Sequence, residues 1–132
     1  MVALVAYDQG DGDPQAEDPV ERLNSRPDFQ ILIYPGPLGV PDVVPATAPP
    51  AFLLVSNFVQ CCSGPVVKLL EGYRNAKSPI EAHIYDKGDH AFNMGYRSTL
   101  KSIRNWPQRL ADWLEDNYFF DPSRREEAKK QR

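Results

Sequence analysis

Two short apolar runs constrain the fold of this chain more than any other sequence feature. They are residues 29–34, Phe-Gln-Ile-Leu-Ile-Tyr, which end at Pro35, and residues 51–55, Ala-Phe-Leu-Leu-Val, which follow Pro49-Pro50. An apolar run that does not alternate with polar residues is typical of a strand covered on both faces, as strands in parallel sheets are. The two runs therefore predict a parallel sheet packed between helices.

Further elements follow these runs along the chain. Apolar residues at helical spacing predict a helix over residues 64–76, and the alternating residues 80–85 predict a half-exposed strand near an edge of the sheet. A last helical region covers residues 97–118, and its stronger helix is expected to begin at Pro107. This order predicts the α/β class, a partial doubly wound parallel sheet of about three strands with flanking helices.

The remaining segments carry loop and tail signals. Residues 8–19 form an acidic, turn-rich stretch that does not match the ligand pattern of a calcium loop. Asp18 followed by Pro19 predicts the start of a short helical turn through Leu23. Residues 121–132 are charged and poor in apolar side chains, so we expect one domain over residues 1–120 and a disordered tail.

Composition excludes several functional classes. The chain has 132 residues, enough for one core, a net charge of −3 and two cysteines. The negative charge argues against a nucleic-acid partner, and no apolar run approaches the ~18–20 residues of a membrane span. Two cysteines are too few for a disulfide scaffold, and no targeting signal is recognisable, so the compartment is not assigned.

His90 is the strongest candidate for chemistry. It follows the predicted strand 80–85 in a loop, and reactive groups of doubly wound sheets lie in loops at the carboxyl ends of strands. A histidine with an unperturbed pKa of ~6.5 can accept and return a proton near neutral pH. From its position alone, an ordinary loop histidine remains the alternative. His83 lies within the strand and is expected to pack or to face solvent.

Four segments in a particular order resemble the carboxyl-terminal half of an α/β hydrolase. The similarity is to the bacterial esterase–lipase branch that includes acetyl-xylan-esterase-like proteins, and it spans roughly residues 2–119. The segments read Arg-Pro-Asp-Phe-Gln-Ile-Leu-Ile-Tyr-Pro (26–35), Ala-Pro-Pro-Ala-Phe-Leu-Leu-Val (48–55), Glu-Ala-His-Ile-Tyr-Asp-Lys-Gly-Asp-His-Ala-Phe (81–92) and Trp-Pro-Gln-Arg-Leu-Ala-Asp-Trp-Leu (106–114).

The resemblance implies that His90 matches the catalytic histidine of a Ser-His-Asp triad. The family places its serine in a Gly-x-Ser-x-Gly elbow, which this sequence lacks, and we expect the chain to correspond to a region that starts just after that nucleophile. The family aspartate lies in the loop that residues 56–63 resemble, which here contains no carboxylate. Asn57 could hydrogen-bond the histidine there without supplying a charge.

These observations predict a fragment of a carboxylic-ester hydrolase that is inactive alone and would act on a small-molecule ester if completed. The alternative is a non-catalytic interaction module. In the hydrolase sheet, strand 29–34 pairs with a further strand that this sequence lacks, so its open edge would favour a homo-oligomer. A small ligand-binding α/β domain is a third interpretation, but no glycine-rich phosphate loop supports it.

Cys61 and Cys62 are two further candidates for nucleophilic or metal-binding chemistry. No basic residue stands beside them to lower a thiol pKa, so a cysteine nucleophile acting with His90 is not expected. Two cysteines and two histidines also lack the spacing of a zinc site. The sequence therefore predicts no metal and no cofactor.

Overall fold

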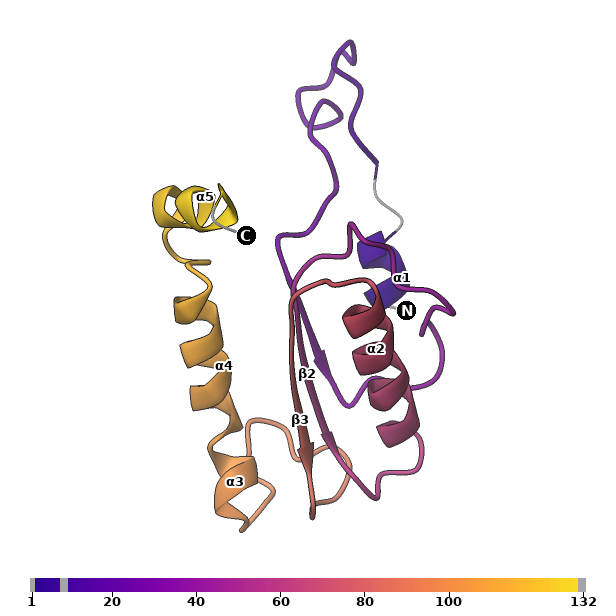
Figure 1. The fold of residues 1–132 in the computed structure, drawn as a ribbon, viewed down its shortest axis with the longest axis vertical. Coiled ribbons are helices and arrows are strands. Elements are labelled where there is room, and N and C mark those ends of the chain that lie inside the picture. The colour runs from indigo at the N-terminus through magenta and orange to yellow at the C-terminus, as the bar shows by residue number, and fades with distance from the viewer. Residues whose placement is uncertain (1, 8–9, 131–132) are drawn as a thin grey trace.

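The computed structural model describes residues 2–7 and 10–130, and in it a three-stranded parallel sheet lies between two layers of helices (Figure 1). The strands are β1 (Gln30–Ile33), β2 (Ala51–Ser56) and β3 (Ile80–Tyr85), in the spatial order β1-β2-β3. This architecture confirms the predicted fold class. Each strand lies within two residues of its predicted bounds.

Strand β2 is the centre of the fold. Its six residues are all buried, and it pairs in parallel with both neighbours, with Ala51 opposite Gln30 on one side and Ile80 on the other. Strand β3 is half-buried along most of its length, as its alternating sequence predicts for a strand at an edge. The unbroken apolar sequence of β2 is therefore explained by cover on both faces and both edges.

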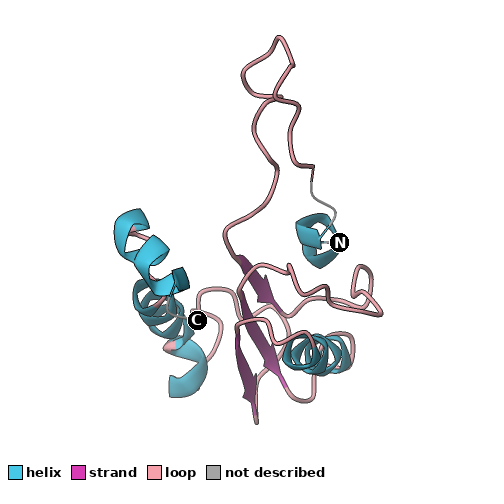
Figure 2. Cartoon of the chain, turned by 45° about the horizontal axis from the view of Figure 1, so that its top comes forward, coloured by secondary structure: helices cyan, strands magenta, loops and turns pink. Residues whose placement is uncertain are grey.

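Helices cover the two faces of the sheet separately (Figure 2). Helices α1 (Val2–Tyr7) and α2 (Ser63–Asn75) pack on the face formed by Ala51, Leu53 and Val55. Helices α3 (Lys101–Arg104) and α4 (Trp106–Asp116) pack on the opposite face, formed by Phe52 and Leu54. Alternate side chains of β2 thus enter two separate apolar clusters.

Two predicted helical segments differ in detail from the structure. The region 97–118 forms two helices, α3 and α4, and Pro107 lies in the first turn of α4, where proline's missing N–H costs nothing. Residues 19–22 form the short turn that the sequence predicts, without a helix after it, and Asp18 Oδ1 accepts a hydrogen bond of 2.8 Å from the Val20 N–H. Asp18 thus closes a local turn without starting a helix.

The charged carboxyl-terminal segment also forms a helix, α5 (Pro122–Lys130), where the sequence predicts a disordered tail. Asp121 precedes its proline and accepts hydrogen bonds from Ser123 and from the Arg124 N–H, which together lower the pKa of Asp121. Arg125 pairs with Asp28 at 2.6 Å and lies 4.6 Å from the Phe119 ring centroid. N-capping and these contacts account for the helix.

No helix within residues 2–7 and 10–130 is both long and apolar enough to cross a bilayer. The proposed boundary between residues 120 and 121 remains a prediction.

Candidate active site

Loops that follow the three strands meet at the carboxyl end of the sheet. Tyr34 directly follows β1, the pair Cys61-Cys62 lies between β2 and α2, and His90 follows β3. The Tyr34 and His90 rings lie 4.7 Å apart between centroids. The sulfurs of the two cysteines and a ring nitrogen of His90 all lie within 4.8 Å of one another. The site that the sequence predicts around one histidine is therefore a cluster of four side chains.

The His90 loop is held in an unusual backbone conformation. Gly88 has a φ of 132°, and Ala91 and Asn93 adopt positive φ values of 60° and 54°. A Cβ on Gly88 would collide with the Ile103 side chain and lie 2.6 Å from Ser56 Oγ, so only glycine fits between β2 and α3. Non-glycine residues at positive φ are uncommon and concentrate at functional sites.

A pocket of about 540 Å³ opens beside His90. Asp89, Arg97 and Ser98 contribute to its wall, which gives it a polar character. Phe92 is 3% exposed and anchors the loop by packing against Tyr34, with ring centroids 5.1 Å apart. The loop is thus fixed by an apolar side chain while the His90 imidazole stays exposed to solvent.

Cys61 and Cys62 form a disulfide between adjacent residues. Cys61 is exposed, whereas Cys62 is only 1% exposed and is the N-cap residue of α2. Two turns position the pair, because the Val59 N–H donates to the Ser56 carbonyl and the Cys62 N–H donates to the Val59 carbonyl. The cysteines are therefore held rigidly against the end of β2.

The β2–α2 loop, residues 57–62, contains no carboxylate that could serve as the acid of a triad. Asn57 is exposed, and its backbone N–H donates to the Tyr85 carbonyl at 2.8 Å. No hydrogen bond among the described residues joins the Asn57 side chain to His90, so its suggested orienting role remains a prediction. Asp86 and Asp89 are exposed on the same loop as His90.

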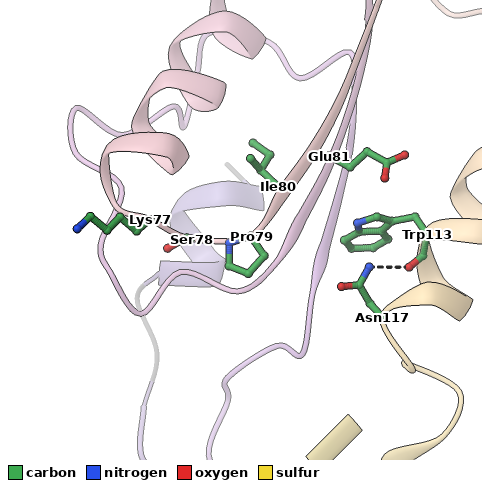
Figure 3. A pocket seen from close by; sticks show the side chains of 7 residues that line it. All are labelled: Lys77, Ser78, Pro79, Ile80, Glu81, Trp113 and Asn117. Atoms are coloured by element: carbon green, nitrogen blue, oxygen red, sulfur yellow. Dashed lines mark hydrogen bonds between the residues drawn. The ribbon is translucent and has the colours of Figure 1, made fainter. Parts of the chain in front are cut away.

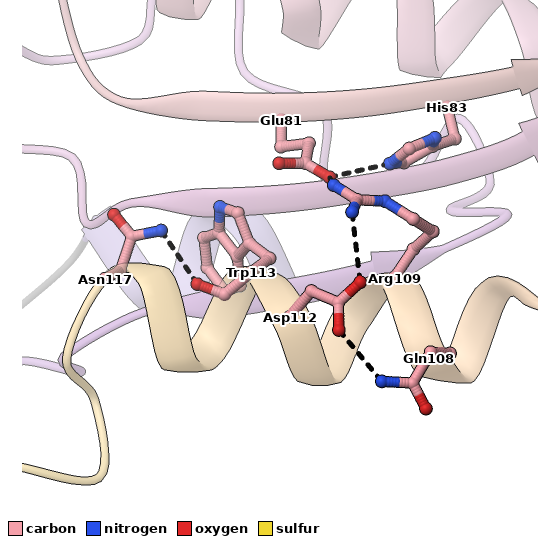
Figure 4. A network of polar contacts seen from close by, with 7 residues as sticks. All are labelled: Glu81, His83, Gln108, Arg109, Asp112, Trp113 and Asn117. Carbon is pink, nitrogen blue, oxygen red and sulfur yellow. Dashed lines mark hydrogen bonds and ion pairs between the residues drawn. The ribbon is translucent and has the colours of Figure 1, made fainter.

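His83 belongs to a separate polar network between β3 and α4 (Figure 4). Its Nε2 lies 2.8 Å from Glu81 Oε1, and the Arg109 guanidinium bridges Glu81 and Asp112 at 3.1 Å each. The hydrogen bond to Glu81 is the main cause of the raised pKa of Arg109. The His83 ring packs on Phe52, with centroids 5.3 Å apart, which agrees with the packing role expected for it.

A second polar pocket, of about 410 Å³, lies at the opposite end of β3 (Figure 3). Residues 77–81 form one wall and Trp113 with Asn117 the other. The Asn117 amide donates to the Trp113 carbonyl at 2.8 Å. This pocket adjoins the amino end of β3, so it is separate from the His90 site.

Sequence reasoning missed the contact between His90 and the cysteines. Strand order could have predicted this contact, because residues that follow adjacent parallel strands lie together at the carboxyl end of the sheet. Cys61-Cys62 and His90 follow neighbouring strands in this way. The contribution of Tyr34 was missed for a similar reason, since it reads as the last residue of an apolar strand.

Comparison with known proteins shows a likeness of fold. No protein-family model matches the sequence, and no curated protein matches it. An acetyl ester-xyloside bifunctional hydrolase from Caldicellulosiruptor lactoaceticus matches with a TM-score of 0.78 and 22% identity, over 89% of this chain and 52% of that one. A sugar hydrolase (YeeB) from Lactococcus lactis matches with a TM-score of 0.58 and 19% identity, over 77% of this chain and 51% of that one.

These matches show that the chain has an α/β-hydrolase-type fold, as the sequence resemblance implies. The chain spans about half the length of the solved structures it matches.

The conformation of the His90 loop predicts that Gly88→Ala destabilises the protein strongly. Overpacking against Ser56 and Ile103 costs ~1–3 kcal/mol, and the positive φ adds a cost of similar size. Gly36→Ala is the matched control, because its Cβ would meet nothing within 4 Å and its φ is not in the left-handed region. Urea unfolding measures both changes. Equal stability of the two variants would contradict the described path of the loop.

Proposed function

We propose that this chain provides the general base of a carboxylic-ester hydrolase of the esterase, lipase or acetyl-xylan-esterase type. The observation that carries the proposal is the position of His90, at the carboxyl end of a parallel sheet with an α/β-hydrolase-type fold and beside a pocket of about 540 Å³. The substrate would be a small-molecule ester. The names of the two matched proteins, both hydrolases and one an acetyl ester hydrolase, support this class.

In this mechanism the imidazole of His90 removes the proton of a serine hydroxyl as the oxygen attacks the ester carbonyl. The same imidazole then returns the proton to the leaving alcohol. His90 is exposed beside the pocket, and the contact with Tyr34 restrains its ring. It is therefore accessible to a substrate while one aromatic ring packs against it.

We infer that the nucleophile is a serine of another polypeptide segment, because no serine of this sequence is suitably placed. None of the seven serines lies in a Gly-x-Ser-x-Gly elbow: Ser25, Ser56, Ser63, Ser78, Ser98, Ser102 and Ser123. Ser56, the serine at the carboxyl end of β2, is 1% exposed and so closed to a substrate. We propose that the 132-residue chain is inactive by itself.

Hydrolysis of ethyl acetate tests this proposal, because a lone imidazole attacks an activated aryl ester directly but does not displace the poor alkoxide leaving group of an alkyl ester. The purified chain is expected to show the same low rate as its His90→Ala variant, because an imidazole without an activated serine lacks the nucleophile of acyl transfer. His83→Ala is the matched control, since His83 lies in a separate network. Turnover that is lost in His90→Ala and kept in His83→Ala would contradict the inactivity of the chain.

The role of His90 is tested by supplying a serine. The chain is fused to the part of the C. lactoaceticus hydrolase that the match leaves uncovered, and cooperative unfolding verifies that the fusion folds. We expect ester hydrolysis that His90→Ala abolishes, and a rise of up to about 10⁴-fold in turnover with Asn57→Asp, which restores a triad carboxylate. Activity in a folded fusion that does not depend on His90 would refute the general-base role.

A second candidate function is self-association through β1, and the open edge of this strand favours it. The Gln30 N–H donates to the Pro50 carbonyl, directly before β2, and the Tyr34 N–H donates to Leu54 of β2, so the backbone groups of Ile31 and Ile33 face the other side. Next to this edge lies an apolar groove of about 500 Å³, lined in part by Val5, Phe29 and Ile31. A second copy of the chain could pair its β1 with this edge and cover the groove.

Charge placed in the groove is expected to dissociate such a dimer. Val5 lines the groove and is 70% exposed, so Val5→Glu adds a carboxylate to the contact without disturbing the core. Val20→Glu is the matched control, because Val20 is also 70% exposed but belongs to the loop of residues 10–28, which projects away from the sheet (Figure 1). Sedimentation equilibrium measures the association constant. A monomeric wild-type protein, or equal weakening by both variants, would rule out association through this edge.

A further inference from the structure

The cluster of Cys61, Cys62 and His90 has the composition of a metal site. One donor atom of each residue lies within 4.8 Å of the donor atoms of the other two. Ligands on one tetrahedral Zn²⁺ lie about 3.4 to 3.8 Å apart, given Zn–S and Zn–N bonds of about 2.3 and 2.0 Å. A shift of the order of 1 Å in the exposed His90 side chain, and opening of the disulfide, would therefore bring the three donors to binding distance.

The amino end of α2 favours negative charge on the cysteines. Cys62 is the N-cap residue of this 13-residue helix, and its side chain makes no capping hydrogen bond. The positive end of the helix dipole, with no acidic residue in the first turn to offset it, lowers the free energy of a thiolate placed there. The helix end thus favours deprotonation of the reduced cysteines, which metal binding requires.

We propose that the reduced chain binds one Zn²⁺ ion through Cys61, Cys62 and His90, with a fourth position open to solvent. Two thiolates and one imidazole suit a borderline-soft d¹⁰ ion better than Mg²⁺ or Ca²⁺, which prefer oxygen ligands. Burial of Cys62 shields one Zn–S bond, while the exposed Cys61 and His90 leave a path for the ion.

Binding depends on the redox state of the cysteines. A dithiol reductant breaks the Cys61–Cys62 bond, delivers two electrons and two protons to the sulfurs, and is itself oxidised to a disulfide. Zn²⁺ then replaces the two thiol protons, which are released to solvent. Oxidation of the pair removes both sulfur ligands, so the same chain has a metal-binding and a non-binding state.

This proposal does not rest on the ester-hydrolase proposal. An imidazole that binds metal through either ring nitrogen carries its proton on the other one and has no lone pair left to act as a base, so the two roles belong to different redox states of one site. Metal binding and ester hydrolysis are also measured separately, and either proposal can fail while the other stands.

Titration with Co²⁺, followed by displacement with Zn²⁺, tests the site. The chain is reduced with a phosphine under anaerobic conditions, the reductant is removed, and absorption of the bound Co²⁺ is recorded. We expect one equivalent of Co²⁺ with thiolate charge-transfer and tetrahedral ligand-field bands, which Zn²⁺ abolishes. The oxidised wild-type chain is the matched control, because its sequence is identical and it should bind no ion.

Single substitutions identify the ligands. Since replacement of outer-shell groups alone typically costs 10–100-fold in affinity, His90→Ala is expected to weaken Zn²⁺ binding at least about 100-fold. Cys61→Ser, at an exposed position, should reduce the charge-transfer intensity, and His83→Ala should bind as the wild type does. Absence of binding by the reduced chain, equal binding by His90→Ala, or one ion per two chains would each overturn the proposal.

Discussion

The burial of β2 at the centre of the sheet positions every other element of the fold. Its six residues are buried, both edges pair with neighbouring strands, and its side chains enter the apolar clusters on both faces of the sheet. A strand with no free edge and no exposed face has one available register. The loops at its carboxyl end are therefore fixed relative to those of β1 and β3, and the side chains that meet there are placed by the sheet itself.

The site at this end combines a rigid support with an exposed reactive group. Buried Phe92 and the tight passage of Gly88 beside Ser56 hold the His90 loop, while the imidazole stays exposed near Tyr34. The adjacent cysteines lie in the β2–α2 loop, where the sequence resemblance alone implies the acid of a hydrolase triad. The redox state of this pair thus decides which partner His90 has: a disulfide leaves the imidazole free, and two thiolates make it part of a ligand set.

The fold could be predicted from the sequence because each strand is identified by a pattern within its own few residues. The unbroken apolar runs identify β1 and β2, and alternation identifies β3 as an edge strand. The position of His90 followed from its place after a strand. The proximity of Cys61-Cys62 was not predictable from spacing, since these residues and His90 are joined only by strand order. Helix α5 was missed because a charged sequence without apolar periodicity hides the cap at Asp121 and the long-range contact of Arg125 with Asp28.

Proton NMR can detect the convergence of the three loops at the carboxyl end of the sheet. Nuclear Overhauser effects are measured between the His90 ring and two sets of protons, the Tyr34 ring protons and the β-protons of Cys61 and Cys62. The structure predicts both sets of cross-peaks in the folded chain. A well-dispersed spectrum in which His90 shows contacts only to its own loop would show that the three loops do not converge.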